Sequence, residues 1–189
     1  MTSEIGPADS HKAVAPAPSK IRVALVTASD SRTTATNEGG RLLRSLIEEA
    51  GFTVVEEALL IEDQPTLRER VASLARPAVA DAVLVTGGTG VAPRDRTPEA
   101  VAPLYERRLP GFGELFRMLS FQEIGPAAML SRAEAGVVDG VLVFLLPGSP
   151  AAIDLAVRKL IAPELGHLVG QLRRGVQPAG RAGEHADER

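Results

Sequence analysis

The sequence predicts an α/β fold of three layers, α/β/α, built around a mostly parallel sheet. Three observations predict it. Short apolar runs alternate with stretches of helical periodicity, no internal repeat is present, and small, polar or acidic residues follow the apolar runs. Strands that are separated by helices favour a parallel sheet covered on both faces, because right-handed crossovers place helices there. In such folds ligands bind beyond the carboxyl ends of the strands.

The first half of the chain supplies two strands and two helices. Residues 21–27 form a compact apolar run and are predicted as a strand, and residues 53–61 as a second strand. Between them, residues 38–50 place leucine, isoleucine and alanine on one helical face, and Gly51 ends that helix. A second helix is predicted after Pro65, where apolar residues recur at helical spacing.

The second half supplies the remaining elements. A buried strand is predicted at residues 82–86, followed by a short helix with Thr97 as its N-cap and Pro103 near its end. A further helix is predicted at 112–121, and a tight turn at Asp139-Gly140 precedes a very apolar strand at 141–146. The last long helix begins at Ser149-Pro150, and Pro163 should kink it.

Length and composition predict one domain with two tails. A chain of 189 residues, 44% hydrophobic and 24% charged, matches one globular domain of roughly 150 residues plus tails. Residues 1–19 and 175–189 show no periodicity, so they cannot offset their ordering entropy by burial and are expected to be disordered. The domain is expected to span residues 20–174.

Charge, cysteine content and hydropathy exclude several functions. A formal charge of −3 supplies no basic field for a nucleic-acid partner. The lack of cysteine excludes disulfides, thiolate zinc sites and cysteine nucleophiles. No apolar run approaches the roughly 20 residues that span a bilayer, so we expect a cytoplasmic protein with no membrane partner. His11 and His185 lie in the predicted tails and His167 in the last helix, which makes a Ser-His-Asp triad improbable.

The segment Thr86-Gly87-Gly88-Thr89-Gly90 directly follows a predicted buried strand. Glycines there allow positive φ and leave backbone N–H groups bare, so a phosphate can approach the chain closely. The lysine of a P-loop and the G-x-G-x-x-G of a dinucleotide-binding fold are both missing. Taken alone, the segment is about equally compatible with a glycine turn that binds nothing.

Two aspartates are expected at the same edge of the sheet. Asp63 follows the second strand, and Asp95 lies five residues beyond the glycine segment. Each has a structural alternative, because Asp63 can cap the helix that follows it and Asp95 can pair with a flanking arginine. Two carboxylates beside a glycine turn also suit Mg²⁺ bound mainly through phosphates and water, as in phosphoryl or nucleotidyl transfer.

Three further segments have two interpretations each. Residues 110–114 form either a loop at the edge of a planar ligand or the entry to a helix with Phe112 in the core. Ser149, after the last strand, either leaves helix amides open to an anion or serves only as an N-cap. Arg132, which follows Ser131, either reaches a ligand phosphate or lies in solvent.

As an ordered set, four segments resemble the molybdopterin adenylyltransferase family of the MogA/MoaB type. They are VLVTGGTGVAPRDRTPEAV (83–101), LPGFGELFRMLSFQEIG (109–125), LSRAEAGV (130–137) and VFLLPGSP (143–150). The resemblance spans about residues 20–172. FRMLSFQEIG together with PGSP is closer to the MoaB branch.

The resemblance implies an enzyme that uses ATP and Mg²⁺ to attach AMP to molybdopterin with release of pyrophosphate, in a homotrimer or a hexamer of two trimers. It implies catalytic and Mg²⁺-binding roles for Asp63 and Asp95. It implies phosphate or nucleotide contacts for Thr86, Gly87, Gly88, Thr89, Gly90, Gly148 and Ser149. It implies a pterin pocket formed by Ser29, Asp30, Pro110, Gly111, Phe112, Gly113, Glu114, Ser131 and Arg132. The enzyme that later inserts molybdenum is a further expected partner.

The chain departs from the family pattern at one place. The family commonly has an acid followed by Ser-Gly after the first strand, where this chain has Asn37-Glu38-Gly39-Gly40. Asp95 is retained, whereas some MoaB-branch members lack the corresponding aspartate and are regarded as inactive. Two other hypotheses stay open, namely a molybdopterin-binding scaffold without the reaction and a domain that recognises another pterin or nucleotide.

Overall fold

The computed structural model describes residues 15–174, which contain one six-stranded sheet of order β2-β1-β3-β6-β5-β4. The strands are β1 (Arg22–Ala28), β2 (Thr53–Leu60), β3 (Ala82–Thr86), β4 (Arg107–Arg108), β5 (Glu134–Val138) and β6 (Val141–Leu146). β2, β1, β3 and β6 pair in parallel, and β5 pairs antiparallel with both β6 and β4. The predicted mostly parallel sheet is confirmed.

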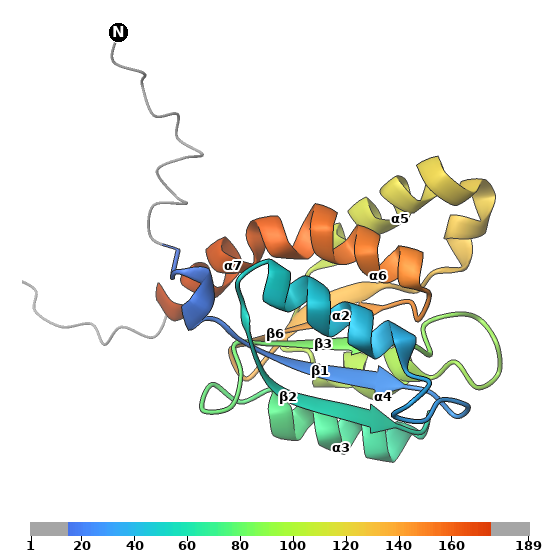
Figure 1. Ribbon diagram of the computed structural model, residues 1–189, viewed down its shortest axis with the longest axis horizontal. Helices are drawn as coiled ribbons and strands as arrows, with labels where there is room; N and C mark the ends of the chain where they lie inside the picture. Colours follow the sequence, from blue (N-terminus) through green and yellow to red (C-terminus); the bar gives the residue numbers. More distant parts are fainter. Residues whose placement is uncertain (1–14, 175–189) are drawn as a thin grey trace, which may run out of the picture.

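Helices cover both faces of this sheet (Figure 1). The helical elements are η1 (Pro18–Lys20), α2 (Glu38–Glu49), α3 (Gln64–Leu74), α4 (Thr97–Val101), η2 (Ala102–Leu104), α5 (Pro110–Ile124), η3 (Gly125–Leu130), α6 (Pro150–Ala156), η4 (Val157–Ile161) and α7 (Ala162–Arg174). α2, α5, α6 and α7 lie on one face, and α3 and α4 on the other. The three-layer α/β/α architecture is therefore confirmed.

Alternation along the strands builds two separate cores. In β1, Val23 and Leu25 pack with α2, α6 and α7, whereas Ala24 and Val26 pack with α3 and α4. β3 lies at the centre of the sheet and all five of its residues are buried. Full burial of a valine or leucine side chain stabilises the fold by about 1.5–3 kcal/mol, so these central strands hold their ends firmly in place.

The strands β5 and β4 are not predicted by the sequence pattern. The tight turn at Asp139-Gly140 is confirmed, and it joins β5 to β6 with positive φ at both residues, 47° and 75°. β5 lacks alternating polarity because Gly136 interrupts it, and a Cβ there would lie 2.5 Å from the ring of Tyr105. Two exposed arginines form the whole of β4, so no strand pattern is visible there either.

Two predicted helix starts are wrong. α5 begins at Pro110 rather than at residue 112, because proline at the first position starts a helix well and tertiary packing overrides the low helix propensity of the two glycines. Thr97 is not the N-cap of α4, since that position belongs to Arg96 and the Thr97 hydroxyl donates to the carbonyl of Gly87 at 2.8 Å. The distortion predicted at Pro163 appears just before it, as the π-helical turn η4.

Most of the predicted tails, residues 1–14 and 175–189, lies outside the described residues. Within the described part, ordered structure already begins before residue 20, because Pro18 and Ser19 belong to η1 and the Ser19 carbonyl accepts a hydrogen bond from the Thr53 hydroxyl at 3.1 Å. None of the helices in residues 15–174 combines the length and apolarity needed to cross a membrane.

Candidate functional site

The carboxyl ends of β1, β3 and β6 meet at one edge of the sheet. Thr86 pairs in register with Thr27 on one side and with Leu146 on the other. Beyond them, Gly87 has φ of 100°, and a Cβ at this residue would lie 2.2 Å from the carbonyl oxygen of Ala28. A Cβ added at Gly148 would lie 3.4 Å from the Cα of Gly87. Only glycine fits where three strand ends approach this closely.

Thr97 holds the glycine turn, residues 86–90, in place through two hydrogen bonds. The Thr97 hydroxyl donates to Gly87 O at 2.8 Å, and its backbone N–H donates to Gly88 O at 3.0 Å. Within residues 15–174, the N–H groups of Gly88, Thr89 and Gly90 donate to no protein acceptor. Successive unpaired amides in a turn form an anion-binding concavity, which is the chemistry predicted for this segment.

Three acids gather beside this turn. Asp30 accepts a hydrogen bond from the Glu62 N–H at 2.9 Å and forms an ion pair with Arg94. A Cβ on Gly88 would lie 3.4 Å from a carboxylate oxygen of Glu62, and one on Gly90 would lie 2.6 Å from an oxygen of Asp95. Asp30, Glu62 and Asp95 are called the acidic cluster below.

The pKa of Glu62, the central member of the acidic cluster, is raised above its usual value. Partial burial disfavours the charged form of the Glu62 carboxyl, and repulsion from Asp30 and then Asp95 raises its pKa further, against a smaller opposing effect of Arg94. A cation placed between these carboxylates would relieve that repulsion. Glu62 was not among the residues predicted from the sequence, although it stands directly before Asp63 in the same polar segment.

Asp63 occupies the position of a helix cap. Its carboxylate accepts hydrogen bonds from the Thr66 N–H at 3.0 Å and from the Thr66 hydroxyl at 2.6 Å, at the N-terminus of α3. These hydrogen bonds, the hydroxyl first, hold the pKa of Asp63 below its usual range. The catalytic role predicted for Asp63 stays a prediction, and its observed contacts are those of the structural alternative.

The acidic cluster fits a weakly held Mg²⁺. In the part of the chain that the structure describes, no three acidic or histidine side chains are arranged to hold a metal ion on their own. Asp30 is already paired, and one oxygen of Asp95 accepts from the Ala92 N–H at 2.8 Å. Glu62 and Asp95 together can supply one or two carboxylate ligands, which is the usual protein share when phosphates and water complete the Mg²⁺ shell.

A pocket of about 460 Å³ lies next to the cluster and contains five of the predicted pterin residues: Pro110, Gly113, Glu114, Ser131 and Arg132. Arg108, Arg117 and Glu134 also line it. Arg117 joins its two walls by donating to Ala133 O at 3.0 Å, and Gly113 permits their close approach, since a Cβ there would lie 2.5 Å from the same oxygen. This cavity is called the arginine-lined pocket below.

The structure does not bring the other predicted pterin residues into this pocket. The Phe112 ring packs against Phe144 in the core, with centroids 5.1 Å apart, so the helix-entry interpretation of this segment holds. Gly111 lies exposed in the first turn of α5. Ser29 accepts from the Arg32 N–H at 3.3 Å in the loop after β1, where Asp30 belongs to the acidic cluster.

Ser149 is an N-cap, since its hydroxyl accepts from the Ala152 N–H at 3.3 Å. Nearby, the departure from the family pattern also has a structural explanation. Asn37 caps α2 by accepting from the Gly40 N–H at 3.0 Å and donates to the Thr27 hydroxyl at 3.1 Å. A Cβ on Gly40 would lie 2.2 Å from the Asn37 amide, so asparagine and glycine here form one packing unit.

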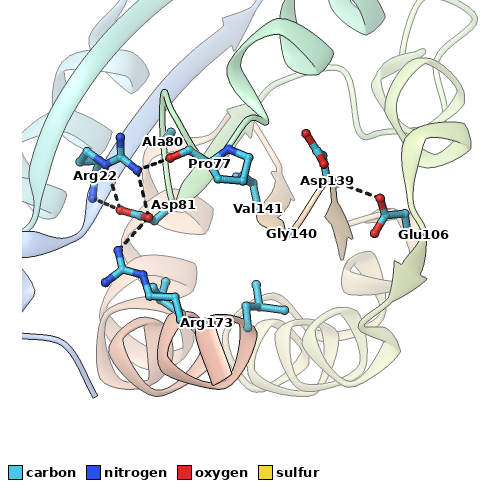
Figure 2. A pocket seen from close by; sticks show the side chains of 11 residues that line it. Arg22, Pro77, Ala80, Asp81, Glu106, Asp139, Gly140, Val141 and Arg173 are labelled. Atoms are coloured by element: carbon cyan, nitrogen blue, oxygen red, sulfur yellow. Dashed lines mark hydrogen bonds and ion pairs between the residues drawn. The ribbon is translucent and has the colours of Figure 1, made fainter. Parts of the chain in front are cut away.

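A cavity of about 700 Å³, larger than the arginine-lined pocket, lies at the opposite edge of the sheet (Figure 2). Four of its charged side chains already have partners: Arg22, Asp81, Glu106 and Arg173. Asp81 accepts from the Arg22 N–H at 2.9 Å and from Arg173 at 2.9 Å, while the Asp139 N–H donates to Glu106 at 3.1 Å. The smaller pockets at the carboxyl edge carry the chemistry that the sequence predicts, so we place the functional site there.

The protein is a three-layer α/β domain whose candidate ligand-binding site lies at the carboxyl edge of the sheet. The site combines the glycine turn, the acidic cluster and the arginine-lined pocket. Residues 24–167 match the model of the family described as probable molybdopterin binding domain. The chain belongs to this family, in the branch of the molybdenum cofactor biosynthesis proteins B.

Relatives and solved structures agree on that branch. The chain is 46% identical over 159 residues to molybdenum cofactor biosynthesis protein B of Bacillus subtilis. The aligned region covers 84% of this chain and 94% of the relative. It is 42% identical over 144 residues to the protein of the same name from Escherichia coli K12, covering 76% of this chain and 85% of the relative.

Among solved structures, a crystal structure of a molybdenum cofactor biosynthesis protein B superposes with a TM-score of 0.80 at 44% identity, covering 84% of this chain and 99% of that one. The tungsten cofactor synthesizing protein MoaB from Pyrococcus furiosus superposes with a TM-score of 0.74 at 31% identity, covering 83% of this chain and 99% of that one. A role in molybdenum cofactor biosynthesis follows from these similarities.

Proposed function

We propose that the protein transfers AMP from ATP to molybdopterin and releases pyrophosphate in an Mg²⁺-dependent reaction. The observation that carries the proposal is the convergence of three features at one sheet edge. The glycine turn offers amides to phosphates, the acidic cluster offers carboxylates to a cation, and the arginine-lined pocket offers cationic walls to a phosphorylated ring compound.

In the proposed reaction, an oxygen of the terminal phosphate of molybdopterin forms a bond to the α-phosphorus of ATP. The bond from that phosphorus to the oxygen of the β-phosphate breaks, and pyrophosphate leaves. A phosphate nucleophile is already ionised at neutral pH, so no general base is required. His167, the one histidine within residues 15–174, lies in α7 and interacts with Glu164 and Gln171 instead.

Different groups of the site are proposed to bind the negative phosphates and the positive metal ion. The amides of Gly88, Thr89 and Gly90 orient a phosphate and stabilise its charge. The carboxylates of Glu62 and Asp95 would hold Mg²⁺, which would supply positive charge to neutralise the triphosphate. A bound cation and the ionised carboxylate of Glu62 would favour each other, so Mg²⁺ binding should lower the raised pKa of Glu62.

Self-association and a cytoplasmic location are parts of the same proposal. Six large apolar side chains are exposed on α5 and η3, between 48% and 74% each: Leu115, Met118, Phe121, Ile124, Met129 and Leu130. Such a concentration marks a protein interface, and a homotrimer or hexamer would cover it. Sedimentation of the wild type and of Phe121→Glu tests this, since the variant should shift toward monomer. The requirement for ATP fits the cytoplasm, and a molybdenum-inserting enzyme remains the proposed downstream partner.

Pyrophosphate release tests the proposal directly. Release from ATP should require both molybdopterin and Mg²⁺, and Asp95→Asn should retain the fold and lower turnover by on the order of 10²-fold or more. Asp154→Asn is the matched control, because Asp154 pairs with Arg158 on the surface of α6. Calorimetric heat on adding molybdopterin without pyrophosphate release would identify a scaffold instead. A wild-type rate in Asp95→Asn would overturn the proposed role of that residue.

A further inference from the structure

Arg132 binds both ends of the loop that carries Asp95. Its Nε donates to the carbonyl of Gly90 at 2.8 Å, and its Nη2 donates to the carbonyl of Asp95 at 2.6 Å. Its Nη1 pairs with the carboxylate of Glu99 in α4. The backbone N–H of Arg132 also donates to Thr89 O at 3.1 Å. One residue from the segment before β5 therefore connects the glycine turn, the loop and α4.

Thr97, at the end of the loop, donates from its hydroxyl to Gly87 O and from its N–H to Gly88 O, and apart from these two hydrogen bonds the loop has few other attachments. Residues 91–94 are exposed, and the ion pair between Arg94 and Asp30 is made by an exposed side chain. Inside the loop, the Ala92 N–H donates to the Asp95 carboxylate at 2.8 Å, and the Asp95 N–H donates to Ala92 O at 2.9 Å. The Asp95 carboxylate thus moves with its own loop, and the positions of the two loop ends decide where it lies.

The guanidinium of Arg132 is better placed to hold the two ends of the Asp95 loop than to bind a ligand. A planar guanidinium directs its N–H groups along fixed lines, and here three nitrogens are used on Gly90, Asp95 and Glu99. Arg132 lines both the arginine-lined pocket and the smaller cavity of about 280 Å³ that contains Asp95. It is the wall between the two.

We infer that Arg132 is a positioning residue, which holds the Asp95 carboxylate at the glycine turn, and not a ligand of the pterin as the family resemblance implies. The inference rests on the proposed function, because it assigns Arg132 to the Mg²⁺ side of the site. Its direct consequence is structural and does not depend on activity: loss of the guanidinium fork releases the loop at residues 90–96.

Hydrogen exchange of the full-length protein without ligands tests that consequence. In Arg132→Lys, the amides of Ala92, Asp95 and Thr97 should exchange at least about ten times faster than in wild type, because an ammonium cannot span three separated acceptors. Exchange in β1 and β6 should stay unchanged. Arg158→Lys is the matched control, since Arg158 also pairs through its guanidinium, with Asp154 and Glu49, on a distant surface.

Glu99→Gln provides a milder second variant, because it removes one charged partner and leaves both carbonyl contacts in place. It should accelerate exchange of the same amides to a smaller extent. Unchanged exchange in both variants would overturn the inference. Faster exchange throughout the sheet would also overturn it, because Arg132 would then support the whole fold and not the loop.

Kinetics separate positioning from pterin binding. Arg132→Lys should lower kcat at least ten-fold and raise the Mg²⁺ concentration needed for half-maximal rate, since small displacements of a catalytic group cost up to about 10²-fold. KM for molybdopterin should change less than two-fold. A raised KM for molybdopterin with unchanged Mg²⁺ dependence would assign Arg132 to the pterin and overturn the inference. If the wild type releases no pyrophosphate, the adenylyl-transfer proposal fails, while hydrogen exchange still decides the role of Arg132.

Discussion

Gly87→Ala should destabilise the fold by about 2–5 kcal/mol. This loss should exceed that of a glycine-to-alanine substitution at Gly51, which also has a positive φ. Two costs add. A positive φ costs an alanine about 1–2 kcal/mol. The added Cβ would also lie 2.2 Å from the backbone oxygen of Ala28, roughly 1 Å inside ordinary contact. Neither backbone can move without separating β1 from β3, so overpacking adds about 1–3 kcal/mol.

Gly51→Ala isolates the first cost. Gly51 has φ of 84°, close to the 100° of Gly87, but the nearest atom to its added Cβ is Pro18 Cβ at an ordinary 3.5 Å. Urea titration followed by circular dichroism suits this chain, which has no tryptophan, provided that protein concentration is held constant. Equal losses of unfolding free energy in the two variants would refute the argument that the strand ends are in unyielding contact at Gly87.

Four further substitutions test other contacts. For Asp81, burial opposes ionisation, but hydrogen bonds from Arg22 and then Arg173 outweigh it and lower the pKa. Its stabilising contribution is therefore complete above the unfolded pKa and lost as pH falls through the folded one, so Asp81→Asn should cost about 1–3 kcal/mol at pH 7 and flatten the acid dependence of the urea midpoint. Thr97→Val leaves the Gly87 carbonyl without its donor and should cost about 1–2 kcal/mol in urea and lower turnover. Asp63→Asn, an equally good cap, should keep both melting temperature and turnover, whereas Glu62→Gln should lower turnover; the opposite result would return the catalytic role to Asp63.

The position of the candidate site was predictable because parallel strands share one carboxyl edge. The strands β1, β2, β3 and β6 were visible as apolar runs in the sequence, and the glycine turn and Asp95 followed from their place after β3. The assignment of Asp63 shows the limit of that approach. Adjacent residues point in different directions, so sequence order alone did not distinguish Glu62, which faces Gly88, from Asp63, which caps α3. The spacing of Asp63 and Thr66 was the available signal for a cap.

Contacts between distant segments were not predictable. Phe112 lies between two glycines, a setting that also suits a ligand-binding loop, and only the approach of Phe144 from β6 places it in the core. Arg132 is another case, because its three acceptors lie 33 to 42 residues away along the chain. Sequence patterns report local periodicity, whereas these side chains are placed by tertiary packing.

The hairpin at Asp139-Gly140 has a consequence for the order in which the site assembles. Because β5 runs against its neighbour β6, its first residue and not its last lies at the edge occupied by the glycine turn. Arg132 and the neighbouring wall of the pocket can therefore reach the Asp95 loop only after the hairpin has closed and docked on β3. A truncated chain that ends before β6 would contain the glycine turn, all three acids and Arg132 itself, and would still be expected to lack a formed site.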